Sequence, residues 1–124
     1  MTAIEAFAIN ADGTAGRITL DRGDKSSYLE PLTKAVDCTN VEPVGIELDD
    51  GTVVTFWFDE EGFMKPNPKL NMGVPHYMRA LKPLGMLQPF VGNCVVTCSD
   101  LVSGDEVSLP AEVMKKFEEM AATV

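Results

Sequence analysis

A nine-residue run without a charged side chain, F-V-G-N-C-V-V-T-C at residues 90–98, limits the folds open to this chain of 124 residues. The run is nearly continuous in apolar character and rich in β-branched residues, which favour extended backbone. A strand with one solvated face alternates polar and apolar residues, whereas a strand that is apolar throughout has to be covered on both faces. The sequence therefore predicts that residues 90–98 form the central strand of a sheet.

Two hairpins are predicted upstream of this strand. The first joins the apolar residues 4–10 to the alternating residues 17–21 through the turn signal Ala-Asp-Gly. The second joins residues 44–48 to residues 52–58 through Asp50-Gly51, one of the dipeptides that tight hairpin turns prefer. Four of about five strands are thereby assigned.

Three helices are predicted, two from the helical spacing of apolar residues and the short one from Pro75 before it and Pro83 and Gly85 after it. They cover residues 28–37, a short segment at residues 76–81 and the C-terminal segment after Pro110. The element order ββ-α-ββ-α-β-α indicates one α+β domain over residues 1–124. We expect a mixed or antiparallel sheet of about five strands, with the helices mainly on one face.

Charge is distributed unevenly along the chain. The formal net charge is −9, yet residues 62–99 carry four bases and no acid. An acidic protein is a poor direct ligand for nucleic acid or for an anionic membrane, because both need a clustered cationic surface. The N-terminus has no signal-peptide pattern, and no apolar stretch approaches the roughly 20 residues that span a bilayer. We expect a cytoplasmic protein, in the host cell if a phage encodes it.

The acid-free region contains a proline-rich loop followed by the short helix, and we expect a binding surface there. Prolines stiffen a loop, so that less conformational entropy is lost on binding. The alternative is that the loop only crosses the edge of the sheet, with its Asn side chains bonded to local backbone groups. Trp57 and Phe63, which flank the loop, are expected in the core. The candidate binding residues are Lys65, Asn67, Lys69, Asn71, His76, Tyr77, Arg79 and Lys82.

The sequence predicts no catalytic residue, metal ligand or cofactor. The single histidine, His76, can be paired with a cysteine only on paper, because nothing in the linear sequence brings the two together. Nucleophile-elbow, phosphate-loop and dinucleotide motifs are absent. Cys38, Cys94 and Cys98 lack zinc-site spacing and are expected to be reduced, small apolar side chains.

Several segments together resemble a known family. They are F-W-F-D-E-E-G at residues 56–62, Asn71 before the short helix, P-F-V-G-N-C-V-V at residues 89–96, and the opening residues 28–36 with the hairpin that follows. The chain is similar in these segments to small bacterial and phage proteins catalogued as domain of unknown function 3846. The resemblance implies a compact α+β fold and a phage or mobile-element setting, and it supplies no catalytic residues.

Three functions are compatible with these features. The first is a small non-enzymatic binding or modulator protein, encoded by a phage or mobile element, that acts on a host protein. The second is a nucleotide-like small-ligand binding protein or enzyme with its site under the loop at residues 63–83, where Arg79 and Lys82 hold a phosphate. The third is an acidic nucleic-acid mimic, although Lys115 and Lys116 dilute the carboxylates of the last helix.

Overall fold

The computed structural model describes residues 2–123 and contains one antiparallel sheet of six strands. The strand order is β2-β1-β5-β4-β3, and the short β6 pairs with the end of β5. The predicted α+β class and both hairpins are confirmed. The elements are β1 (Ala3–Ile9), β2 (Ala15–Asp21), α1 (Leu29–Val36), β3 (Val41–Glu47), β4 (Val53–Asp59), the 3-10 helix η1 (Gly62–Met64), α2 (Gly73–Leu81), β5 (Cys94–Ser99), β6 (Glu106–Val107) and α3 (Ala111–Ala122).

Strand β5 lies in the middle of the sheet, between β1 and β4. Its first five residues are buried, as the apolar run predicts. The strand starts at Cys94 instead of residue 90, because Gly92 has a φ of 78° and interrupts the extended backbone. Just before this turn, Val91 forms an isolated bridge with Leu70. The start of the predicted strand therefore pairs with the proline-rich loop.

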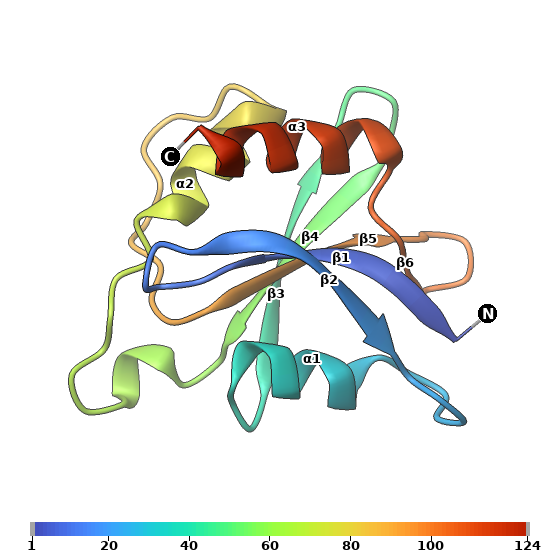
Figure 1. Ribbon diagram of the computed structural model, residues 1–124, viewed down its shortest axis with the longest axis horizontal. Helices are drawn as coiled ribbons and strands as arrows, with labels where there is room; N and C mark the ends of the chain where they lie inside the picture. Colours follow the sequence, from blue (N-terminus) through green and yellow to red (C-terminus); the bar gives the residue numbers. More distant parts are fainter. Residues whose placement is uncertain (1, 124) are drawn as a thin grey trace.

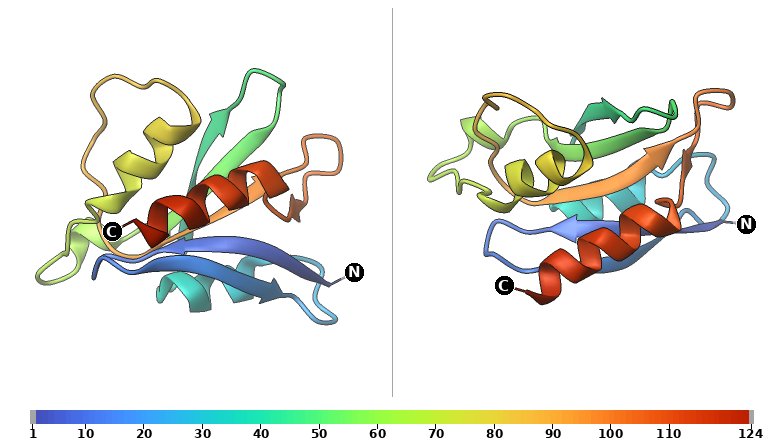
Figure 2. Two further views of the ribbon diagram at one scale, coloured as in Figure 1. Left: turned by 45° about the horizontal axis from the view of Figure 1, so that its top comes forward. Right: turned by 90° about the horizontal axis from the view of Figure 1, so that it is seen from above.

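Helices cover both faces of the sheet (Figure 1). Helix α1 packs Leu32 and Val36 against a cluster that includes Val95 of β5. Helices α2 and α3 share the opposite face, where they bury residues such as Met78 and Phe117 over β1, β4 and β5. Two of the three helices thus lie on one face, and α1 provides the second cover that β5 needs. Figure 2 shows α2 and α3 side by side above the strands.

Three aromatic rings join the helices to the sheet. Phe7 of β1, Tyr77 of α2 and Phe117 of α3 contact each other with ring centroids 5.0 to 5.4 Å apart. Tilted and edge-on geometries at this distance bring the positive edge of one ring against the negative face of another. Phe7 and Phe117 are fully buried. This aromatic cluster fixes where α2 and α3 sit on the strands.

Replacement of Phe117 by alanine should destabilise the fold by about 3–5 kcal/mol, because a large buried ring leaves a cavity next to two other rings. Urea unfolding followed by circular dichroism measures the loss. Met86 is 99% exposed, and Met86→Ala is the matched control, with an expected change within about 0.5 kcal/mol. Equal stability of the two variants would contradict this account of the core.

Candidate functional site

The eight predicted binding residues come from two separate parts of the structure. Four lie in the loop after η1, at residues 65–71, and four lie on α2 or at its end. Figure 1 places the loop beside the C-terminal end of α1 and places α2 on the other face of the sheet. A hollow of about 210 Å³ under the loop is lined from the α1 side by Val36 and Asp37. The predicted residues therefore do not form one continuous surface.

Asn71 joins these two parts and is buried, with 2% of its surface exposed. Its side-chain amide donates to the carbonyl of Ile9 at 2.8 Å and to that of Gly92 at 2.9 Å, and its Oδ1 accepts from the Gly73 amide at 3.2 Å. Its backbone amide donates to the carbonyl of Phe90 at 2.8 Å. Asn71 thus lies inside the protein and not on the binding surface that the sequence indicated. As in the alternative interpretation of the loop, its side chain bonds to backbone groups, but two of these, at Ile9 and Gly92, are distant in the sequence.

Lys65 is paired with an acid of the sheet. Its Nζ lies 2.6 Å from Oδ2 of Asp59, the last residue of β4, whose side chain is only 7% exposed. The hydrogen bond to Asp59 raises the pKa of Lys65. The other oxygen of Asp59 accepts from the Glu61 amide at 2.9 Å. Lys65 therefore holds the loop against the end of β4, and half of its side chain remains exposed.

The two bases of the α2 region bind backbone carbonyls. Arg79 donates to the carbonyl of Gly85 at 3.1 Å, and Lys82 donates to the carbonyl of Glu47 at 3.1 Å. Neither side chain lines the hollow under the loop. A phosphate placed under the loop, as the nucleotide alternative requires, would not meet these two residues.

The remaining residues of α2 divide between core and surface. Tyr77 belongs to the aromatic cluster, and burial raises its pKa. His76 is exposed, whereas Cys94 is completely buried and its thiol pKa is raised well above the usual value by burial. Burial also raises the thiol pKa of Cys98. A thiol kept protonated in this way is a poor nucleophile, and the exposed imidazole does not share its environment.

Accessible predicted residues occur along the loop as well as on α2. Lys69 and Asn67 are exposed, and Asn67 has a left-handed φ of 54°. Phe63 is 61% exposed, so the expectation that it lies in the core is wrong, whereas Trp57 is partly buried against the α1 side. The reason is that η1 leaves the sheet at Gly62 and turns its next residues outward. The exposed large apolar side chains of this stretch are Phe63, Met64, Leu70 and Met72.

Comparison with known proteins connects this arrangement to one family. A family model described as Domain of unknown function (DUF3846) matches residues 4–122. The chain belongs to the DUF3846 family. No curated protein and no solved structure matches it. Within residues 2–123 of this DUF3846 chain, no helix is long and apolar enough to span a bilayer, and no three His, Cys, Asp or Glu residues are grouped to hold a metal ion.

A network of polar side chains on the α1 face of the DUF3846 fold was not predicted from the sequence. Glu106 of β6 accepts hydrogen bonds from Thr97 at 2.6 Å and from Ser99 at 3.0 Å. Trp57 Nε1 donates to Thr97 at 2.9 Å, and Thr55 lies 2.7 Å from Ser99. The available signal was the alternation of hydroxyl residues along β4 and β5, which face one another in the sheet. Because its members satisfy each other, the network holds β6 against β5.

Replacement of Asn71 by aspartate should cost about 3 kcal/mol of stability at pH 7, because two carbonyl oxygens lose their donor and face a negative charge. Burial and these two oxygens should raise the pKa of the introduced carboxyl above its unfolded value of about 3.9. The charge-dependent part of the penalty is then fully present above the raised pKa and is lost as the pH falls below the unfolded one. The protonated carboxyl has one donor in place of two, so the recovery is partial. Urea unfolding at pH 7 and at pH 4 should show this recovery.

Asn67→Asp is the matched control, because Asn67 is exposed and both residue types tolerate a left-handed φ. It should change stability by less than about 0.5 kcal/mol at either pH. A similar small change for Asn71→Asp would show that the buried amide does not hold the loop.

Proposed function

We propose that this protein is a non-enzymatic binding protein, encoded by a phage or mobile element, that modulates a host protein in the host cytoplasm. The observation that carries the proposal is the exposure of four large apolar side chains within ten residues. Large apolar side chains exposed near one another are characteristic of interaction sites, and we infer from their closeness in sequence that these four form one surface. We call this the loop surface; it consists of Phe63, Met64, Lys69, Leu70 and Met72.

The composition of the loop surface favours a partner that is apolar at its centre and acidic at its rim. Lys69 precedes Leu70 in the chain, and residues 62–99 contain no acid, while Asp12 of the first hairpin lies within electrostatic reach of Lys69. Met64 and Met72 are 84% and 79% exposed. Methionine is flexible and polarisable, so that it adapts to partner surfaces of different shape. Positive charge at the edge would favour encounter with an acidic partner.

The loop is held in position before any partner arrives. The Lys65–Asp59 pair fixes its first half, and the Asn71 amide fixes its end. Pro66 and Pro68 restrict the backbone between these two points. A loop restrained in this way loses less entropy on binding than a free one. This supports a role in recognition for residues whose side chains contribute nothing to the core.

The two alternative functions receive less support from the same contacts. Arg79 and Lys82 donate to backbone carbonyls away from the hollow that a nucleotide would occupy. On α3, the carboxylate of Glu118 is paired with Arg17 at 2.8 Å, and Lys116 donates to the Ala80 carbonyl. Bases therefore interrupt the carboxylates that a nucleic-acid mimic would align. We retain the binding function as the proposal.

The triple variant Met64→Ser, Lys69→Glu, Met72→Ser should lose partner capture from a lysate of the native host by about tenfold or more, since hot-spot residues each contribute 1–2 kcal/mol or more. Immobilised protein and quantitative mass spectrometry measure the capture. Lys65 and Arg79 are left intact because they hold the fold. The matched control is Leu101→Ser, Val102→Ser, Lys115→Glu, which alters two exposed apolar residues and one exposed base elsewhere.

Both triple variants should unfold at the same urea concentration as the unaltered protein. Partner capture that is equal for the loop variant and the control would overturn the assignment of the loop surface.

A further inference from the structure

The two outer strands of the sheet differ in whether they can accept another strand. In an antiparallel pair, alternate residues point both backbone groups at the neighbour, and the residues between them point both groups away. The bonds from Asn10 to Thr14 and from Arg22 to Thr2 fix this alternation in β2, and the bond from Leu48 to Thr52 fixes it in β3. In both outer strands, the odd-numbered residues therefore face outward.

The outward edge of β3 is less able to pair than that of β2. Pro43 is one of its outward residues and has no N–H to donate. Glu47 is another, and its carbonyl already accepts from Lys82 Nζ at 3.1 Å. These are two of the devices by which proteins prevent pairing at a sheet edge. An incoming strand would therefore lose two of the eight outward backbone groups that Val41, Pro43, Gly45 and Glu47 would otherwise offer.

The outward edge of β2 is open. Its outward residues are Ala15, Arg17, Thr19 and Asp21, and each can both donate and accept. Within residues 2–123, the sheet ends at β2 and nothing pairs with its outer side. An edge of seven residues without proline, bulge or covering segment is a template for a further strand.

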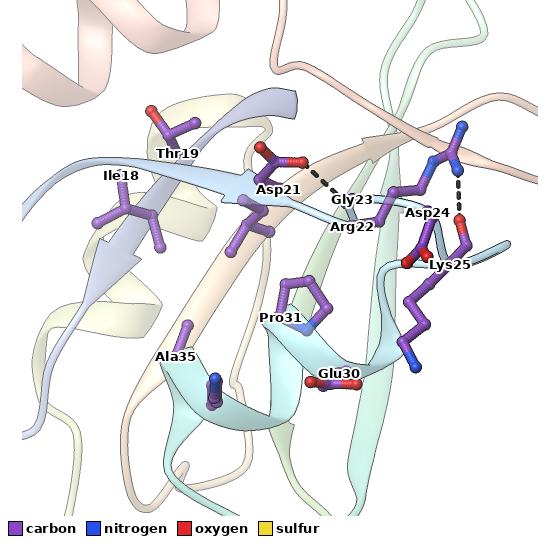
Figure 3. Close-up of a pocket in the computed structure, with 12 residues that line it drawn as sticks. Ile18, Thr19, Asp21, Arg22, Gly23, Asp24, Lys25, Glu30, Pro31 and Ala35 are labelled. Carbon is purple, nitrogen blue, oxygen red and sulfur yellow. Dashed lines mark hydrogen bonds between the residues drawn. The ribbon is translucent and has the colours of Figure 1, made fainter. Parts of the chain in front are cut away.

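A groove of about 690 Å³ runs beside this edge, between β2 and α1. Figure 3 shows Ile18 of β2 pointing toward Pro31 and Ala35 of α1 across this space. Its charged lining residues are three acids and three bases: Asp21, Asp24, Glu30, Arg22, Lys25 and Lys34. Residues 1–61 carry thirteen acids and four bases, and these four bases are Arg17 and the three in the groove. The edge is thus locally neutral in a strongly acidic chain.

We propose that the β2 edge pairs with β2 of a second copy of this chain, antiparallel and with Thr19 opposite Thr19 across a two-fold axis. Only the odd-numbered residues of β2 have free backbone groups, so they must lie opposite odd-numbered residues of the second copy. The register can therefore change only in steps that keep this correspondence. In this register Arg17 of each copy lies opposite Asp21 of the other. Two opposite-charge pairs form by symmetry, and each such cross-strand pair is favourable.

The same register matches the side chains on the α1 face. Ile18 of each copy lies opposite Leu20 of the other, where side chains approach most closely. Ile18 is only half-buried in one copy, so pairing would cover it. Moving the register one pair in either direction loses the charge pairs, because Arg17 then faces Thr19 or the turn at Gly23. The planar guanidinium of Arg17 can bind Asp21 of the second copy while keeping Glu118, since it has five donors.

Cysteine cross-linking tests the pairing and its register. Residues in a hydrogen-bonded antiparallel pair have Cα atoms about 5.5 Å apart, which suits a disulfide. Thr19→Cys, in a Cys38→Ser background, should oxidise to a covalent dimer in most of the protein. Asp21→Cys in the same background is the matched control, because the two copies of this position would lie about 13 Å apart along the strands. Equal cross-linking at the two positions, or none at position 19, overturns the register.

Charge exchange tests the pairing without a covalent bond, with sedimentation velocity as the measurement. Asp21→Arg alone and Arg17→Asp alone should each raise the dimer dissociation constant about tenfold or more, because like charges then face each other twice. The double variant should restore dimer formation, although it lacks the Arg17–Glu118 pair just as Arg17→Asp does. A protein that stays monomeric up to millimolar concentration, or a dimer that neither single change weakens, overturns the proposal.

Discussion

The burial of β5 on both faces is the constraint from which the rest of the architecture follows. A strand with five consecutive buried residues needs an apolar layer above and another below. Helix α1 supplies one layer, and α2 with α3 supplies the other. The two long hairpins then flank β5 on either side, so that both of its edges are paired. The position of every helix and hairpin is thereby fixed relative to one strand.

Local pattern was sufficient to predict the two hairpins, the central strand and the three α-helices, whereas the contacts that define the candidate site join distant residues. Both hairpins and the central strand follow from alternation, turn dipeptides and continuous apolar character. Asn71, by contrast, bonds to Ile9, which is 62 positions away, and no local signal distinguishes it from the exposed Asn67. Strand β6 has only two residues and is held by Glu106, so that its sequence shows no period. Phe63 is exposed because η1 turns away from the sheet, which hydrophobicity alone does not reveal.

The acid-free stretch at residues 62–99 divides into three parts that have different roles. Residues of β5 lack carboxylates because a buried charge is expensive. Lys65, Arg79 and Lys82 are engaged with Asp59 or with backbone carbonyls, so that they serve the fold. The side chains of the loop surface, with Lys69 among exposed apolar residues, have no such role in the fold. Charge along the sequence therefore indicated a candidate region, and the contacts reduce the proposed binding residues to a few.

The contrast between the two sheet edges has a consequence for how the protein behaves when concentrated. A sheet that could accept strands at both edges would allow open-ended growth into filaments. Among the residues that the structure describes, Pro43 and the Lys82–Glu47 contact remove backbone groups from one side of the sheet. A strand added at β2 uses the other side, and the resulting particle ends in edges that pair less well. The fold thus disfavours continued edge-to-edge growth.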